Sequence, residues 1–191
     1  MTARLIFICH ASTHAVRAAA FAGDEELDER GRAAAAALAG QIPDAERCWT
    51  SPELRTRQTA QALGCEAIVA QELRDCDYGA WTGSGFDEIW GRDPEAATKW
   101  LRDPEAAPHG GEPLASLMRR VAAWLDAQRE FSGATLVVTH ASVIRAAIVH
   151  AIEANPQSFW RIDVAPLSQT RLSGANGRWN LAAIGPAPSK R

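Results

Sequence analysis

The sequence contains few cysteines, and none of them is spaced like a metal or redox motif. Cys9, Cys48, Cys65 and Cys76 form no CxxC pair and no dense framework, which argues against a disulfide scaffold. No apolar stretch is long enough to cross a bilayer, and the first residues lack the basic segment and long apolar core of a signal peptide. A net charge of -3 gives no general attraction to nucleic acid or to anionic membranes. These absences predict a cytoplasmic protein that binds neither nucleic acid nor membrane.

The sequence does have the composition and patterning of an ordinary globular protein. Its 191 residues are 47% hydrophobic and 23% charged, which is enough for one substantial core. Apolar runs alternate with helical patterns, and this predicts strands at 4–9, 48–50, 66–69 and 135–139 and helices at 28–38, 51–63, 114–129 and 142–152. We therefore expect a single domain over residues 1–191, an α/β protein built as a three-layer α/β/α sandwich with a mostly parallel central sheet.

Two further segments complete the expected architecture. Residues 169–172 and 178–181 flank a glycine-containing stretch at 174–177, which predicts a hairpin at an antiparallel edge of the sheet. Residues of about 76–112 show weak periodicity and are rich in Trp, Gly and Pro, which predicts a short lid of small helices and loops. Trp81, Trp90 and Trp100 in this lid are candidates for stacking on an aromatic or sugar-like group, and simple packing is the alternative.

A histidine closes each of two apolar runs. His10 ends the run that begins at Leu5, and His140 ends the run that begins at Leu136. In an open parallel sheet, ligands bind outside the carboxyl ends of the strands, so both imidazoles are expected to face one pocket. Imidazole serves as a nucleophile, a proton carrier or a metal ligand near neutral pH. The sequence therefore places its candidate chemistry at this edge of the sheet.

Five segments, in order, resemble the motifs of the histidine phosphatase superfamily, also called the phosphoglycerate mutase-like fold. The resemblance runs from residue 4 to about residue 181. The segments are His10, at the histidine of an Arg-His-Gly motif; Ser51–Ala60, which matches Ser-Pro-x-x-Arg-x-x-Gln-Thr-Ala; Leu73–Gly83, around an acidic residue; Gly110–Glu112, before a long helix; and Val137–Arg145, around a second histidine.

This resemblance implies a catalytic set. His10 would be the nucleophile that takes a phosphoryl group on nitrogen, and Arg55 would hold the non-bridging oxygens, since a guanidinium fork suits phosphate. His140 would donate a hydrogen bond to the same oxygens, and Asp75, in place of the more usual Glu, would protonate the leaving oxygen. No metal or other cofactor is implied. The expected partner is a small molecule, a phosphate ester, and the resemblance permits a homodimer.

An aspartate is a demanding choice for the general acid. Its reference pKa lies below that of glutamate, so the pKa of Asp75 would have to be raised by a larger amount, for instance by burial, to keep a proton near neutrality. The side chain is also shorter than that of glutamate by one methylene group.

The sequence departs from the family's pattern beside both histidines. The motif arginine is Cys9, the motif glycine is Ala11, which is followed by Ser12, and a common Gly-Gly after the second histidine is Ala141-Ser142. We count Cys9, Ser12 and Ala141 among the expected substrate contacts, together with Arg55. Arg17, or another nearby arginine, is a candidate to replace the lost positive charge.

The loss of the motif arginine leaves several alternatives open. Cys9 is either a packing residue or a thiol nucleophile activated by a histidine, and a zinc site formed with His10, His140 and Asp75 has suitable ligand types. The favoured function is a phosphomonoesterase that acts on a small phosphorylated metabolite through a phosphohistidine on His10. The alternatives are an isomerase, lyase or hydrolase repurposed on the same scaffold, or a catalytically silent protein that binds an anion or metabolite.

Overall fold

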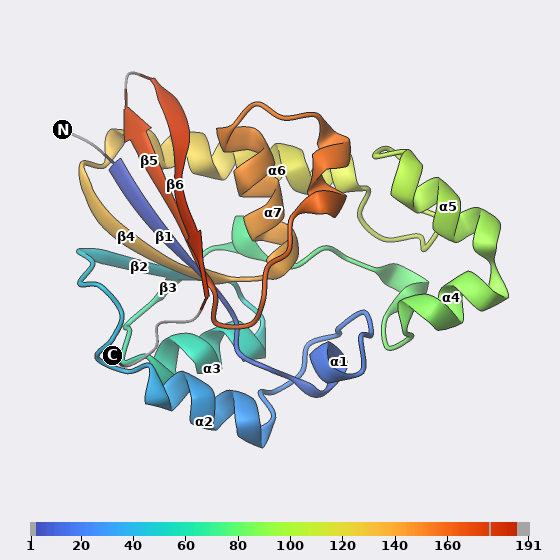
Figure 1. Cartoon of the computed structure of the whole chain (residues 1–191), viewed down its shortest axis with the longest axis horizontal. Helices are drawn as coiled ribbons and strands as arrows, with labels where there is room; N and C mark the ends of the chain where they lie inside the picture. Colours follow the sequence, from blue (N-terminus) through green and yellow to red (C-terminus); the bar gives the residue numbers. More distant parts are fainter. Residues whose placement is uncertain (1–2, 176, 187–191) are drawn as a thin grey trace.

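The core of the protein is a six-stranded sheet, seen in a computed structural model that describes residues 3–175 and 177–186. The strand order is β3-β2-β4-β1-β5-β6. The first four of these strands are parallel to one another, whereas β5 pairs antiparallel with both β1 and β6. The strands are β1 (Ala3–Cys9), β2 (Arg47–Thr50), β3 (Ile68–Val69), β4 (Gly133–Thr139), β5 (Gln169–Ala175) and β6 (Arg178–Gly185). The predicted mixed α/β sheet is thus confirmed, and its antiparallel edge is the predicted hairpin (Figure 1); Asn176 of the predicted turn lies outside the described residues.

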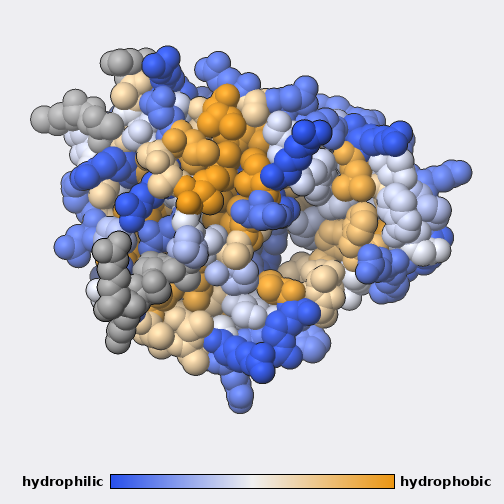
Figure 2. All heavy atoms as spheres, in the orientation of Figure 1, coloured by the Kyte–Doolittle hydropathy of each residue, from blue (hydrophilic) through white to orange (hydrophobic). Residues whose placement is uncertain are grey.

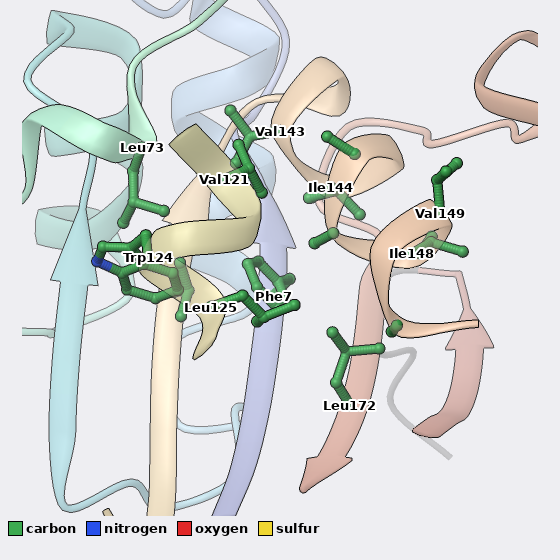
Figure 3. Packing of buried hydrophobic residues seen from close by; sticks show 14 of the residues in the cluster. Phe7, Leu73, Val121, Trp124, Leu125, Val143, Ile144, Ile148, Val149 and Leu172 are labelled. Atoms are coloured by element: carbon green, nitrogen blue, oxygen red, sulfur yellow. The ribbon is translucent and has the colours of Figure 1, made fainter. Parts of the chain in front are cut away.

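Side-chain alternation along the central strands gives the sheet two buried faces. Phe7 and Val137 pack with α6 (Leu114–Ala127) and α7 (Ala141–Ala151), and Figure 3 shows Phe7 beside residues of both helices. Their neighbours along the strands, such as Ile8, point to the other face and pack with α2 (Glu29–Ala37) and α3 (Leu54–Ala62). A strand buried on both faces reads as a continuous apolar run, which is why β1 and β4 are the clearest strands in the sequence.

Most of the remaining elements lie around the carboxyl ends of the parallel strands, whereas η3 comes just before the amino end of β4. Figure 1 shows α4 and α5 as a lobe that stands away from the sheet. Its small core contains Trp81, Ile89 and Trp100, all of them buried. The elements are α1 (His14–Arg17), η1 (Gln71–Leu73), η2 (Gly79–Trp81), α4 (Phe86–Arg92), α5 (Pro94–Arg102), η3 (Gln128–Glu130) and η4 (Pro156–Arg161). The short helices predicted for residues of about 76–112 are η2, α4 and α5. Trp100 of α5 lines the cavity described below.

The starts of two helices show where local sequence patterns predict a helix boundary correctly and where they do not. Asp28 is the N-cap of α2, and its carboxylate accepts a hydrogen bond from the Gly31 backbone N–H, as a capping aspartate should. The helix predicted at 51–63 begins later, at Leu54, because Glu53 is its N-cap and keeps an extended backbone. This shift frees the Glu53 side chain for the site. Within the described ranges, no helix has the length and the apolar content needed to cross a membrane.

Candidate functional site

The two predicted histidines meet at the ends of neighbouring strands. β1 and β4 pair in parallel with Cys9 opposite Thr139, so His10 and His140 both leave the sheet at the same level. The backbone N–H of His10 still donates to the Thr139 carbonyl at 2.8 Å. The two rings have their centroids 5.3 Å apart and are inclined by 63°. The prediction that both imidazoles come together is therefore confirmed.

One nitrogen of His10 is fixed and the other is left available. Nδ1 lies 2.8 Å from the Ala11 carbonyl oxygen, which only accepts, so Nδ1 carries the proton. Nε2 then holds the lone pair, and His10 lines a cavity. Burial, reinforced by the charges of His140 and Arg55, lowers the pKa of His10 to about 3. The ring is therefore neutral near pH 7, as a nitrogen nucleophile must be.

Asp75 and Arg55 form an ion pair at the base of the site. Arg55 is 1% exposed; its Nη2 donates to Asp75 Oδ2 at 2.7 Å and its Nη1 donates to the Gly23 carbonyl at 2.7 Å. Burial alone would raise the pKa of Asp75, but the charges of His140 and Arg55 and the hydrogen bond from Ser142 outweigh it and leave the pKa below its ordinary value. The raised pKa expected for a general acid is thus not found in the free protein, because the aspartate is already paired with a buried cation.

Two buried nitrogen atoms beside this pair have no partner. Within the described residues, Arg55 Nε and His140 Nδ1 are buried and make no hydrogen bond. Nδ1 lies 3.5 Å from Asp75 Oδ2, which is an ion-pair distance rather than a hydrogen bond. Unpaired buried polar groups cost free energy and are uncommon in native proteins. Arg55 Nε is a donor without an acceptor, and His140 Nδ1 also donates when the ring carries both protons, so an anion would satisfy both atoms.

Glu53 is a member of the site to which the sequence reading gave no role. Nε2 of His140 lies 3.1 Å from Glu53 Oε2 and 2.7 Å from Ser51 Oγ. Because a carboxylate only accepts, Nε2 is the donor. Glu53 Oε1 also accepts from the Asp75 backbone N–H at 3.0 Å. Burial raises the pKa of Glu53, but the hydrogen bonds and charge at His140 and Ser51 lower it to about 2. In the sequence, the only indication of a role for Glu53 is its position in the Ser-Pro-x-x-Arg segment.

Two departures from the family's pattern compensate for each other. Ser142 Oγ donates to Asp75 Oδ1 at 2.5 Å, and the Cys76 backbone N–H donates to the same oxygen at 2.8 Å. The hydroxyl therefore holds the shorter acidic side chain in place. The sequence showed both substitutions separately, but only their proximity reveals that they act together.

The cavity itself has a volume of about 210 Å³ and lies between the sheet edge and the lobe. Figure 2 shows the surface hollowed between the main body and this lobe, with hydrophobic residues along the rim. Of the predicted site residues, His10, Asp75 and Ala141 line it, whereas Arg55 and His140 lie behind them. Arg145 also lines it, one helical turn after Ala141 on α7.

Arg145 is the nearby arginine that the cavity contains in place of Arg17, which was the candidate named from the sequence. Its Nε donates to the Ile162 carbonyl at 2.7 Å, which anchors the side chain. No carboxylate in the described ranges lies within ion-pair distance of its guanidinium, whereas Arg55, Arg17 and Arg120 each have one. Arg145 therefore supplies an uncompensated positive charge to the cavity. In the sequence, Arg145 is marked only by its position at the end of the Val137–Arg145 segment.

Three predicted substrate contacts do not line the cavity. Cys9 is 3% exposed and packs in the core with α6 and α7, because strand alternation turns it away from the His10 side chain. Burial raises the pKa of its thiol to about 12, so it is not an activated nucleophile. Ser12 Oγ donates to Asp28 at 3.0 Å, and Arg17 is exposed and pairs with the same carboxylate at 3.6 Å. The described residues contain no group of three or more His, Cys, Asp or Glu side chains arranged to hold a metal ion.

Only one of the three lid tryptophans reaches the cavity. Trp100 lines it, while Trp81 is buried in the lobe core and Trp90 is 44% exposed on the surface. The stacking role therefore stays open for Trp100 alone.

Comparison with known proteins gives a family model that covers nearly the whole chain. The model of the histidine phosphatase superfamily, branch 1, matches residues 5–185. Phosphoserine phosphatase 1 of Hydrogenobacter thermophilus is 29% identical over 172 residues, or 82% of this chain and 80% of that protein. A bifunctional protein of Mycobacterium tuberculosis is 35% identical over 127 residues, which is 62% of this chain. The match spans only about a third, 35%, of that mycobacterial protein.

Solved structures agree with this match. A mycobacterial glucosyl-3-phosphoglycerate phosphatase superposes with a TM-score of 0.82 at 25% identity, over 98% of this chain and 100% of that one. A phosphoserine phosphatase of Entamoeba histolytica, solved with phosphoserine, superposes with a TM-score of 0.86 at 22% identity over 95% of this chain and 96% of that one. At this identity the second likeness concerns the fold.

Proposed function

The chain belongs to branch 1 of the histidine phosphatase superfamily, and from this premise we propose that it is a phosphomonoesterase that transfers the phosphoryl group of a small ester to His10. The phosphatases among its relatives and structural neighbours support a hydrolytic, phosphatase-type function. Within this class, the finer proposal concerns the residues that carry the reaction.

The reaction proceeds in two steps. The lone pair of His10 Nε2 attacks phosphorus, a P–N bond forms, the bond from phosphorus to the ester oxygen breaks, and Asp75 gives its proton to the leaving alkoxide. Water then attacks the phosphohistidine, the P–N bond breaks, and Asp75 takes a proton from that water. The products are the alcohol and inorganic phosphate. Arg55 and His140 donate to the phosphoryl oxygens in both steps.

Asp75 acquires its acidic role only when substrate binds. In the free protein its pKa is held down mainly by the charges of His140 and Arg55. A phosphoryl group that takes over the Arg55 guanidinium removes this support and brings a second negative charge next to the carboxylate. Both changes raise a carboxyl pKa. Substrate binding therefore converts Asp75 from an ion-pair partner into a proton donor.

The observation that carries this proposal is the state of His10. Its Nδ1–H is tied to the Ala11 carbonyl at 2.8 Å, so the reactive Nε2 points the other way, in a ring that lines the cavity. The unpartnered Arg55 Nε is a donor that an anionic phosphoryl group would satisfy, and the unpartnered His140 Nδ1 donates as well when the ring carries both protons.

A trapped phosphoenzyme tests the proposed function. Brief mixing with a phosphate ester, alkaline quenching and mass spectrometry should give an acid-labile phosphoryl group on the peptide that contains His10. The burst should be as large at pH 5 as at pH 7, because the pKa of His10 is lowered to about 3 and the ring stays neutral down to that range. Turnover without any labelled His10 peptide, in a quench that preserves phosphohistidine, would refute the mechanism.

Arg145 replaces the motif arginine that is Cys9 here. Removing its charge in Arg145→Met should lower kcat/KM about 100-fold, as loss of one stabilising donor does. Arg145→Lys should keep more activity than Arg145→Met. The exposed Arg161→Met is the matched control and should behave like wild type. If the kinetics of Arg145→Met are unchanged, Arg145 does not take the role of the missing motif arginine, and a repurposed site is favoured.

A further inference from the structure

The polar groups of the cavity are gathered mainly at one end. His10, Asp75 and Ser142 occupy the end next to the sheet, where the phosphoryl group would react, and Arg145 Cζ lies 5.6 Å from the centroid of the Phe159 ring. Most of the remaining lining is apolar or aromatic. The aromatic members are Phe21, Tyr78, Trp100, Phe159 and Trp160. The organic part of a bound ester would therefore lie among rings.

These rings form a rigid wall because they pack on one another. The ring centroids of Trp100 and Trp160 are 4.5 Å apart, those of Phe159 and Trp160 are 4.9 Å apart, and those of Phe21 and Tyr78 are 4.7 Å apart. Aromatic pairs at such distances add about 0.5–1.5 kcal/mol each beyond area burial. The wall thus keeps its shape and offers both ring faces and ring edges to a ligand.

The volume limits the ligand to one ring. An apolar cavity of about 150 Å³ already binds benzene, and drug-sized ligands use pockets of about 300 Å³ or more. The volume of about 210 Å³ here accommodates one six-membered ring together with a phosphoryl group. The rest of a larger ligand would lie outside the cavity.

The lining offers few partners to a polar alcohol. Asp75 and Arg145 are the charged residues of the described lining; Asp75 is paired with Arg55, and the Arg145 guanidinium lies beside the Phe159 ring. An amino-acid or sugar ester would place ammonium or hydroxyl groups among the rings. Each such buried group costs about 1–3 kcal/mol when it lacks a partner. The rings themselves carry polar groups, among them the Tyr78 hydroxyl and Trp160 Nε1, a buried N–H with no acceptor in the described part of the chain.

We propose that the substrate is a phosphate monoester of a single-ring aromatic alcohol, held with its ring against Phe21, Trp100 and Trp160. This inference rests on the proposed function for the reacting end and adds the class of the leaving alcohol.

The kinetic test compares esters of primary alcohols only, so that the leaving groups react alike. Benzyl phosphate should show at least a tenfold higher kcat/KM than phosphoserine or glucose 6-phosphate. Ala22, half-buried in the lining, offers a filling variant: Ala22→Leu should lower kcat/KM for benzyl phosphate at least fivefold. The exposed Ala18→Leu is its control and should leave the rate unchanged. Equal or higher kcat/KM for phosphoserine or glucose 6-phosphate would overturn the inference.

A binding measurement separates this inference from the proposed function. By calorimetry, benzylphosphonate should bind at least tenfold more tightly than methylphosphonate, and Ala22→Leu should abolish the difference. If no ester is turned over and the difference in phosphonate affinity remains, the phosphatase proposal fails and the ring site stands. If His10-dependent turnover is seen but the two phosphonates bind equally, the ring site fails and the phosphatase proposal stands.

Discussion

The variant His10→Ala is expected to lose kcat by a factor on the order of 10⁴ or more, because removal of a nucleophile that acts within a cooperating set abolishes nearly all the catalysis that the set provides. Among the described residues, no neighbouring group can replace the His10 nucleophile. His140 Nε2 is engaged by Ser51 and Glu53, and burial raises the pKa of the Cys9 thiol to about 12. Steady-state hydrolysis of an aryl phosphate, measured at several enzyme concentrations, is the assay.

The control for this variant is His14→Ala. His14 lies on α1, four residues after His10, and is exposed, so its loss should leave kcat within twofold. Thermal unfolding of both variants separates lost chemistry from lost folding. Residual activity of His10→Ala within tenfold of wild type, with an intact fold, would show that phosphoryl transfer does not pass through His10.

The sequence was sufficient for the parts of the fold that depend on local patterns. β1 and β4 are buried on both faces, so their apolar runs were unmistakable, and the parallel arrangement followed from the helices between the strands. The ends of these strands then placed His10 next to His140. The start of α3 was less well predicted, because Pro52 is an acceptable first helical residue and only the backbone geometry makes Glu53 the N-cap.

The electrostatics of the site could not be obtained in the same way. That Asp75 is paired with Arg55, and that its pKa is therefore lowered rather than raised, depends on a contact between residues 20 positions apart. The presence of Arg145 in the cavity lining likewise depends on which face of α7 meets β1. Arg17 was nearer in sequence, but its side chain is on the surface and pairs with Asp28.

The largest expected effect on stability comes from Arg55→Met. The Arg55 guanidinium is buried and neutralises Asp75, whose side chain is 15% exposed. Breaking a buried pair from one side leaves an uncompensated charge and typically costs 3–5 kcal/mol, so we expect the free energy of unfolding to fall by about 3 kcal/mol. Urea denaturation should show a lower midpoint with an unchanged slope. Phosphatase activity should fall about 100-fold or more, because a donor to the phosphoryl oxygens is lost.

A second substitution distinguishes the ion pair from simple packing. In Arg55→Met/Asp75→Asn the remaining carboxylate charge is removed, so most of the lost stability should return while the activity stays low. Arg57→Met, on the exposed side of the same helix, should change stability by no more than about 0.5 kcal/mol. If the double variant is as unstable as Arg55→Met, the loss comes from the packing of the arginine stem. If it recovers, the charge on Asp75 is what Arg55 neutralises in the free protein, and this is the pairing that a phosphoryl group must break to make Asp75 an acid.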